Sequence, residues 1–322
     1  MKKYGFLLLV TAVVVFASLP VQAAEKLVKG NFILATGGTA GTYYGFGGVI
    51  AQALNSATGA NITANSTGAS VENARLIGSG EVDMAFIQSD VIAYALAGSH
   101  NFTNTGKIAN LKVIASLYPE PIHVVTIDRN IKSVEDLKGK AVSVGAAGSG
   151  DDASARVILE AYGMNYDDID ERYLSNAEAS TALQDASVVA AMYATGAPNA
   201  GLVELSLKRP FYILSIPADK QKVLFETCPY FTSHTITKDV YKLEEDADTL
   251  AVKAVLAVRE EMSEDDVYHL TKALFEKADE IASLHAKGRD IRLENAMEGV
   301  LPGSVHPGAA KYYQEKGIAV PQ

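Results

Sequence analysis

The chain of 322 residues contains one cysteine, no tryptophan and six histidines. Cys228 cannot form an intramolecular disulfide, so the fold must be stabilised by a packed core, and we expect a buried thiol. The histidines show neither H-x-x-x-H nor H-E-x-x-H spacing, and no G-x-S-x-G occurs, which argues against a metal site and a serine nucleophile. We therefore expect no catalytic residue, no metal and no cofactor, and the protein is not predicted to be an enzyme.

Long apolar runs are absent beyond the N-terminal segment. Lys2 and Lys3 precede an apolar run over residues 6–16, and small residues follow as far as Ala24, a pattern typical of a secretory signal peptide. We predict cleavage after about Ala23, so residues 1–23 are the signal peptide and the mature chain is exported to the periplasm. The formal net charge of −10 argues against nucleic acid and anionic membrane surfaces as partners and leaves small ligands open.

The mature chain alternates between strand-like and helical patterns. Removing residues 1–23 from 322 leaves 299 residues, a length that suggests two domains. The alternation from residue 31 onward is typical of βαβ units and a largely parallel sheet, and it predicts strands over 32–35, 61–66 and 82–88. Each of these strands is followed by a predicted helix, over residues 44–55, 70–78 and 89–96.

Two segments are predicted to carry the chain between domains. The first is residues 111–127, where Pro119 and Pro121 argue against one continuous central strand, and the second lies near residues 211–217. We therefore predict a hinged α/β protein with lobe I over 24–117 plus 217–322 and lobe II over 118–216. In the last part of lobe I, residues 249–260 are interpreted as a hairpin and 263–285 as one amphipathic helix.

A stretch rich in glycine and hydroxyl groups, "TGGTAGTYYG", follows the first predicted strand at residues 36–45. It has no G-x-G-x-x-G, and no lysine occurs between Lys29 and Arg75, so a phosphate or dinucleotide cradle is not indicated. Such glycines also serve plain tight turns. We nevertheless predict a ligand site, because the carboxyl ends of strands in open α/β sheets bind ligands. The side chains concerned are Thr36, Thr39, Thr42 and Tyr43.

Similar polar stretches follow four other predicted strands. They are "STGASVEN" at 66–73, "IQSD" at 87–90, "GAAGSGDDASA" at 145–155 and "YATGAPNA" at 193–200. Each alone is consistent with an ordinary helix cap, but five of them divided between two lobes predict the two walls of a cleft. Helix N-termini carry partial positive charge and unpaired N–H donors, so hydroxyls and amides there can hold a carboxylate without a lysine. Asp151 and Asp152 are interpreted as solvated or helix-start carboxylates.

Taken in order along the chain, these motifs resemble a known family. "TGGTAGTYYGFGGVIAQALN", "STGASVENARLIGSGEVDMAFIQSD", "LYPEPIHVV", "SVEDLKGKAVSVGAAGSG" and "HPGAAKYYQEKG" are similar to those of the TAXI solute-binding receptors of TRAP transporters, over residues 32–317. The resemblance implies a type II periplasmic binding protein fold with two α/β lobes joined by a two-strand hinge. It also implies a monomer that delivers a small carboxylate, above all glutamate or a related amino acid, to a TRAP membrane permease subunit.

Carried over position by position, the resemblance implies twelve ligand-facing residues. They are Thr36, Thr39, Thr42, Tyr43, Ser70, Glu72, Asn73, Gln88, Ser89, Ser149, Gly150 and Thr195. Glu72 is expected to receive an α-ammonium group. The chain departs from the family pattern at Ala40, Gly45 and Asp151, and a carboxylate at Asp151 either competes with an anionic ligand or meets an ammonium group. The alternatives left open are a 2-oxoglutarate or other dicarboxylate receptor, a sensor for a membrane kinase, and an exported enzyme acting on a small acid.

Overall fold

Three strand–helix units form the first half of the protein. The computed structural model describes residues 27, 28, 30–228 and 230–322. In it β1 lies between β2 and β3, parallel to both, and a helix follows each of these strands. The elements are β1 (Asn31–Ala35), α1 (Thr42–Thr58), β2 (Asn61–Asn65), α2 (Ser70–Ser79), β3 (Met84–Gln88) and α3 (Ser89–Ala97). The predicted βαβ organisation of this region is confirmed.

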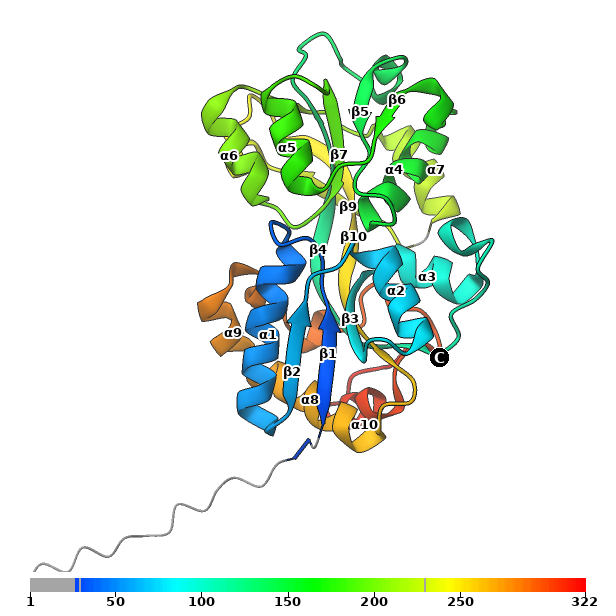
Figure 1. Cartoon of the computed structure of the whole chain (residues 1–322), viewed down its shortest axis with the longest axis vertical. Helices are drawn as coiled ribbons and strands as arrows, with labels where there is room; N and C mark the ends of the chain where they lie inside the picture. The colour runs from blue at the N-terminus through cyan, green and yellow to red at the C-terminus, as the bar shows by residue number, and fades with distance from the viewer. Residues whose placement is uncertain (1–26, 29, 229) are drawn as a thin grey trace, which may run out of the picture.

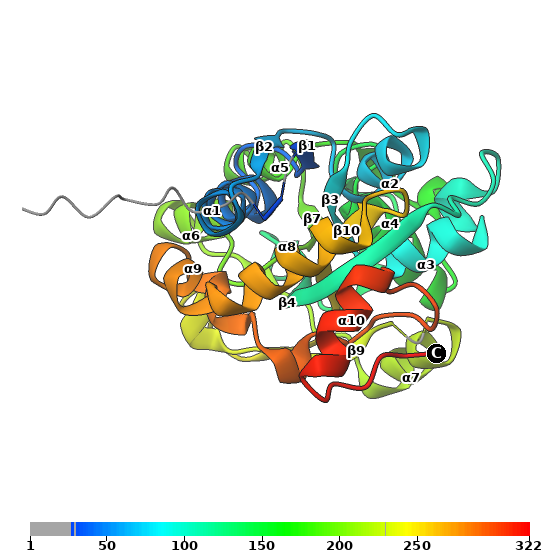
Figure 2. The ribbon, with the colours of Figure 1, turned by 90° about the horizontal axis from the view of Figure 1, so that it is seen from below.

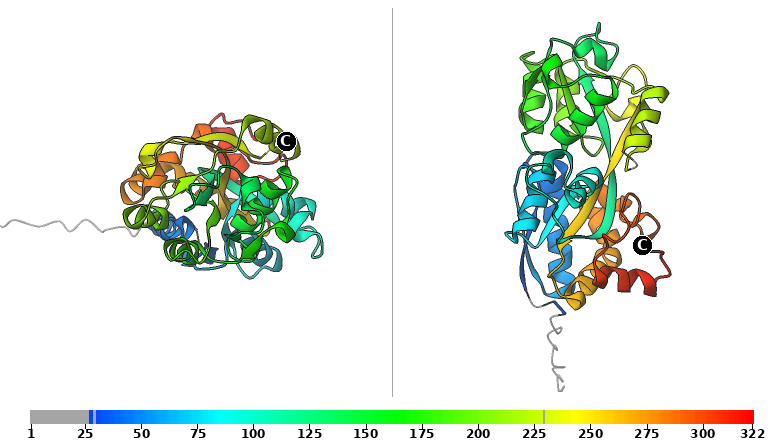
Figure 3. Two further views of the ribbon diagram at one scale, coloured as in Figure 1. Left: turned by 90° about the horizontal axis from the view of Figure 1, so that it is seen from above. Right: turned by 90° about the vertical axis from the view of Figure 1, so that its right-hand side faces the viewer.

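Two long antiparallel strands connect the halves of the molecule. β4 (Leu111–Thr126) and β10 (Ala247–Arg259) pair along residues 111–121 and 251–259, and the strand order is β2-β1-β3-β10-β4-β7-β5-β6. Figure 1 shows an upper and a lower lobe with β4 and β10 running between them, and the right-hand view of Figure 3 shows the same stacking from the side. The chain therefore has two α/β lobes joined by a two-strand hinge.

β4 corrects the prediction that two prolines prevent one continuous strand here. The carbonyl oxygen of Pro121 accepts a hydrogen bond from the N–H of Thr195, on the β7 side of β4. In a strand, the N and C=O of one residue face the same side, so the missing N–H donors of Pro121 and Pro119 also face that side. β7 pairs with β4 from Ile122 onward, so both prolines lie beyond the last pair of that ladder, where their missing N–H donors leave the pairing of the two strands intact.

The second lobe is built around β5, β6 and β7, which are parallel to one another, while β7 is antiparallel to β4. Its elements are β5 (Ala141–Ser143), α4 (Gly150–Ala161), β6 (Asp170–Arg172), α5 (Asn176–Gln184), β7 (Ala190–Ala194), α6 (Ala200–Lys208), β8 (Tyr212–Ile213), α7 (Ala218–Thr227) and β9 (Thr232–Ile236). α7 packs against α4, and β9 pairs with the first part of β10. The expected boundary between residues 216 and 217 stays a prediction, and these contacts favour a later one, within β10.

The C-terminal part returns to the first lobe and covers it with helices. α8 (Glu264–Glu276) and α9 (Ala278–Leu284) pack on α1, and α10 (Pro307–Glu315) packs on α8, as the view from below shows (Figure 2). The single helix predicted over 263–285 is therefore wrong, because the chain turns at Lys277. The predicted hairpin is also wrong. Residues 250–258 form one strand between β3 and β4, where eight of the nine side chains are buried, which leaves no turn for a hairpin.

Short 3-10 turns connect several of these elements. They are η1 (His100–Phe102), η2 (Val134–Leu137), η3 (Tyr166–Asp168), η4 (Lys238–Val240), η5 (Ala286–Asp290) and η6 (Leu293–Asn295). Cys228 is buried with its sulfur 4.0 Å from the hydroxyl of Tyr94, which confirms the expected buried thiol. Among the residues that the structure describes, no helix combines the length and apolarity needed to span a bilayer. The predicted signal peptide lies outside the described residues.

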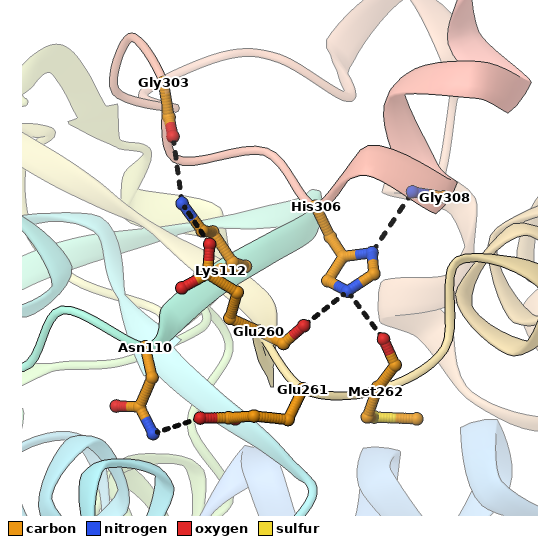
Figure 4. Close-up of polar contacts among 8 residues, drawn as sticks. All are labelled: Asn110, Lys112, Glu260, Glu261, Met262, Gly303, His306 and Gly308. Carbon is orange, nitrogen blue, oxygen red and sulfur yellow. Dashed lines mark hydrogen bonds and ion pairs between the residues drawn. The ribbon is translucent and has the colours of Figure 1, made fainter.

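A buried histidine fastens the start of α10 to the end of β10 (Figure 4). His306 Nδ1 accepts a hydrogen bond from the Gly308 N–H at 3.1 Å, so the ring proton is on Nε2. Nε2 then donates to the carbonyl oxygens of Glu260, at 3.3 Å, and Met262, at 3.1 Å. Lys112, on β4, makes an ion pair with Glu260 at 3.3 Å. These contacts fix the C-terminal segment on the lobe that carries α1.

Candidate functional site

A cavity of about 370 Å³ lies between the two lobes, beside the hinge strand β4. Its walls are the strand-end loops that precede α1 and α2, the end of β3, one residue of β4, and the starts of α4 and α5 with the end of β7. The lining residues are Gly37, Gly38, Thr39, Ala40, Gly41, Thr42, Tyr43, Ser66, Thr67, Gly68, Ala69, Ser70, Gln88, Glu120, Ala146, Ser149, Gly150, Asp151, Ser175, Asn176, Ala177, Ala194 and Thr195.

Eight of the twelve residues predicted to face a ligand line this cavity. Five come from the first lobe and three from the second, so the structure brings together residues that are up to 156 positions apart, from Thr39 to Thr195. The eight are Thr39, Thr42, Tyr43, Ser70, Gln88, Ser149, Gly150 and Thr195. Strand-end polarity was therefore a good guide to this cavity, and ligand contact by these residues stays a prediction.

The start of α1 offers hydrogen-bond donors to the cavity. Gly41 occupies the N-cap position, no side chain caps the helix, and its first turn has no acidic residue. The first N–H groups of a helix have no partner within the helix, and the helix dipole adds partial positive charge there. Thr39 and Thr42 add hydroxyl groups at the same wall. This wall suits an anion, whereas α4 is already capped by Ser149, whose hydroxyl accepts from the Asp152 N–H.

Two of the predicted residues that do not line the cavity support its first wall from behind. Thr36 donates its hydroxyl to the carbonyl oxygen of Asn65 at 2.6 Å. Asn73 donates from Nδ2 to the carbonyl oxygens of Thr36, at 2.6 Å, and Phe86, at 2.8 Å, and accepts from the Thr67 hydroxyl. Both side chains are fully buried. They join the ends of β1, β2 and β3, so this geometry gives them a supporting role and no contact with a ligand.

The other two lie elsewhere. Glu72 is exposed and its carboxylate accepts from the Gly68 N–H at 2.8 Å, so it closes its own loop and does not reach the cavity lining. The expected role of Glu72 as partner of an α-ammonium group is not supported by this position. Ser89 is buried and its hydroxyl accepts from the Lys253 N–H at 3.1 Å, which ties the start of α3 to β10.

Sequence reasoning missed Glu120, the one lining residue on the hinge. It stands between the two prolines of β4, is 2 % exposed, and accepts hydrogen bonds from the hydroxyls of Tyr43 at 2.7 Å and Tyr118 at 3.4 Å. Its pKa is raised to about 8, chiefly by burial and also by the negative charges of Asp151 and Asp90, against the lowering effect of the hydrogen bond from Tyr43. A lone carboxylate inside an apolar strand was the signal that could have identified it.

Asp151 is the other carboxyl group of the lining. It is 9 % exposed, its Oδ1 accepts from the Ala194 N–H at 2.7 Å, and burial raises its pKa to about 7. It is therefore a helix-start carboxylate, as expected, but a buried one. The lining contains no lysine, arginine or histidine, and within the described part of the chain no group of three potential metal-ligating side chains occurs.

The buried carboxyl groups predict how stability depends on pH. Burial raises the pKa of Asp90 to about 7, as it does for Asp151, and that of Glu120 to about 8. Groups with a raised pKa are protonated in the folded state and ionised in the unfolded state, so the folded protein binds more protons and loses stability as pH rises through these values. Burial lowers the pKa of His123 from 6.5 to about 4. This group makes stability rise with pH, but only below pH 6.5.

We therefore expect the melting temperature of the ligand-free protein to fall as pH rises from about 6.5 to about 8. Thermal unfolding in matched buffers measures it. Glu120→Gln should flatten the upper part of this profile, whereas Glu245→Gln, at an exposed position, should leave it unchanged. A melting temperature that is constant or rises over this interval in the wild-type protein would contradict the expectation.

Contacts between the lobes surround the cavity. Gln88 Nε2 donates to the carbonyl oxygen of Ala194 at 3.2 Å, and the Glu72 N–H donates to that of Gly148 at 3.2 Å. Lys287, on η5, donates from Nζ to the carbonyl oxygen of Ala197 at 2.7 Å. These three hydrogen bonds join residues of the first lobe to residues of the second. The lobes are therefore closed on each other in this structure.

Two α/β lobes, two hinge strands and a cavity at the strand ends between the lobes define the class of protein as one with the fold of periplasmic solute-binding proteins. A profile of the NMT1-like family matches residues 34–317, and the chain belongs to this family.

Solved structures agree on the fold. The alkanesulfonate-binding protein SsuA from Xanthomonas axonopodis pv. citri, bound to MOPS, is 15% identical, with 89% of this chain and 84% of that chain covered and a TM-score of 0.50. A putative L-cystine ABC transporter from Listeria monocytogenes is 14% identical, with 84% of this chain and 99% of that chain covered and a TM-score of 0.51. An ancestral arginine-binding protein bound to arginine is 15% identical, with 80% of this chain and 98% of that chain covered and a TM-score of 0.50. The predicted type II fold is confirmed by this likeness, which at such identities concerns the fold alone.

Proposed function

We propose that this protein is an exported solute-binding receptor that captures a small carboxylate-bearing solute between its lobes in the periplasm. The observation that carries the proposal is the uncapped start of α1 at the cavity, beside the hydroxyls of Thr39 and Thr42. Hydrogen bonds to an ionised group contribute about 1.5–3 kcal/mol each, so a few such donors hold a carboxylate without a basic residue. The family and the two-lobed fold support a binding role rather than catalysis.

The chemistry of the lining favours an amino acid over a dicarboxylate. Glu120 and Asp151 are the acidic residues of the lining, which has no basic residue. Both carboxyl groups can accept from an ammonium group, which an amino acid has and 2-oxoglutarate lacks. A ligand with an ammonium group is better matched to this charge pattern than 2-oxoglutarate. Glutamate or a related amino acid is the solute that we propose.

The transporter that the receptor serves is also a proposal. The motifs that resemble TAXI receptors of TRAP transporters include the loops at 36–45 and 66–73, and residues of both loops line the cavity. We therefore propose a TRAP membrane permease subunit as partner of the monomeric receptor. Co-purification of the exported protein with a TRAP permease, and not with an ABC permease, would support this; an ABC permease in the eluate would contradict it.

The binding proposal is tested with two substitutions at the α1 wall. Thr42→Ala removes a hydroxyl and Tyr43→Phe removes the hydroxyl that donates to Glu120. We expect each to weaken the binding of the best amino acid of a panel by about 10-fold, the size of one charge-assisted hydrogen bond. Isothermal titration calorimetry measures the affinity, and ligand-dependent melting confirms occupancy.

Tyr44→Phe, at the exposed neighbour of Tyr43, and Thr227→Ala, on the exposed face of α7, are the matched controls. Unchanged affinity in both Thr42→Ala and Tyr43→Phe would show that the loop before α1 is a tight turn that does not contribute to binding. A panel of amino acids and organic acids that produces no heat and no melting shift would refute the receptor, and turnover of a bound acid, seen by mass spectrometry, would identify an enzyme instead.

A further inference from the structure

Three side chains of the cavity lining provide hydrogen-bond acceptors. Glu120 comes from the hinge strand β4 and Asp151 from the first turn of α4, in the second lobe. The charges of these two groups act on each other, since that of Asp151 raises the pKa of Glu120. Two carboxyl groups in one buried cavity without a basic residue in its lining disfavour ionisation of both unless a cation arrives.

The third acceptor is the side-chain oxygen of Gln88. The Gln88 amide is oriented by its Nε2, which donates to Ala194, and Oε1 has no hydrogen-bond partner among the described residues. Gln88 is 3 % exposed and lies against Gly150, and both residues line the cavity. A buried oxygen without a donor costs about 1–3 kcal/mol, so a ligand donor that reached Gln88 Oε1 between the lobes would be stabilised there.

The lining also contains groups of complementary character. The uncapped start of α1, with Thr39 and Thr42, presents donors, while Glu120 and Asp151 present acceptors. A ligand with a carboxylate at one end and an ammonium group at the other matches both sets of groups. An ammonium group has three N–H donors, which is the number of acceptor side chains that Glu120, Asp151 and Gln88 provide.

We propose that Glu120, Asp151 and Gln88 form an ammonium subsite, so that a primary amine on the solute is required for tight binding. This inference rests on the proposed function, and it deepens it by naming the solute class as zwitterionic amino acids. In this proposal the three residues take the role that the sequence analysis gave to Glu72, because Glu72 lies outside the lining.

Binding of an amine in this subsite should change the protonation of Glu120. The groups that act on Glu120 are Tyr43 on α1, Tyr118 on β4, Asp151 on α4, Asp90 on α3 and Lys287 on η5. Since burial raises the pKa of Glu120 to about 8, this carboxyl group is largely protonated in the empty protein at pH 7. An ammonium group stabilises the carboxylate and displaces its proton, whereas a carboxylate placed there would retain the proton or recruit one.

The test compares amino acids with their own 2-oxo acids, which have a carbonyl group in place of the amine-bearing carbon and are otherwise the same. L-Glutamate and 2-oxoglutarate are the first pair, followed by the pairs for alanine, aspartate, leucine and phenylalanine. We expect at least one amino acid to bind at least 10-fold more tightly than its 2-oxo acid. Calorimetry at pH 7 in two buffers of different ionisation enthalpy should show net proton release on binding of that amino acid.

Glu120→Gln and Asp151→Asn preserve the size of the side chains and remove the charges, so each should bring the two affinities of that pair closer together by at least 5-fold. Glu245→Gln and Asp239→Asn, at exposed positions, are the matched controls and should leave the ratio unchanged. Melting curves of the ligand-free variants establish that they are folded.

The outcomes separate this inference from the function on which it rests. Equal or tighter binding of a 2-oxo acid, net proton uptake, or an amine preference that survives in both variants would overturn the ammonium subsite while leaving a carboxylate receptor in place. No binding of any member of the panel would overturn the receptor and the subsite together.

Discussion

Gly150→Ala is expected to weaken solute binding by about 5- to 150-fold while leaving the ligand-free protein as stable as before. Gly150 lies at the start of α4 in the second lobe, and a Cβ atom there would overlap the side-chain amide of Gln88 in the first lobe. Overpacking of this kind costs about 1–3 kcal/mol, and 1.4 kcal/mol is a factor of ten in affinity. The two residues belong to different lobes, so the overlap arises only when the lobes close.

A double variant separates the overlap from other effects. Gln88→Ala with Gly150→Ala keeps the added Cβ and removes the amide that it would overlap. The double variant should therefore bind more tightly than Gly150→Ala alone, although the contact of Gln88 with Ala194 is then lost. Gly45→Ala is the matched control, because a Cβ at Gly45, within α1, meets nothing within 4 Å. Calorimetry measures the affinity, and thermal unfolding measures the stability of the ligand-free protein. Wild-type affinity in Gly150→Ala would show that binding does not require this approach of the lobes.

Asn73→Ala is expected to lower the free energy of unfolding by about 2–5 kcal/mol. Its Nδ2 donates to the carbonyl oxygens of Thr36 and Phe86, and its Oδ1 accepts from the Thr67 hydroxyl, all within 2.8 Å. Alanine would remove this partner from all three groups. The Thr36 carbonyl oxygen keeps the Thr67 hydroxyl at 3.1 Å, and each buried group left unpaired costs about 1–3 kcal/mol. Chemical denaturation followed by circular dichroism measures the change.

Asn61→Ala provides the comparison at an exposed asparagine, whose Nδ2 donates to Asn31 at 2.9 Å. We expect a change there of about 0.5 kcal/mol or less, typical of surface substitutions. A loss of stability at Asn73 similar to that at Asn61 would refute the supporting role. If the Asn73→Ala protein had wild-type stability but bound the ligand more weakly, Asn73 would be a ligand contact after all.

The local parts of the fold could be predicted because they depend on local patterns. Short apolar runs that end in glycine, serine and threonine identified β1, β2 and β3 and the helices that follow them. The predictions failed where the outcome depends on what lies beside a segment. β4 is continuous because Pro119 and Pro121 face the β7 side before the ladder with β7 begins at Ile122. β10 is one strand because it pairs with β4 over 251–259, with β9 over 247–251 and with β3 over 254–258.

The candidate site divides in the same way. The sequence by itself determined which loops carry hydroxyls, amides and glycines at strand ends, and eight of the twelve residues predicted from those loops line the cavity. Tertiary structure alone decided that Asn73 points behind the wall while Gln88 reaches Ala194, and that Glu120 on the hinge belongs to the site. The physical reason is that side-chain type and spacing are local properties. The direction of a side chain and the charge around it depend on packing between segments far apart in the chain, here the two lobes and the strands that join them.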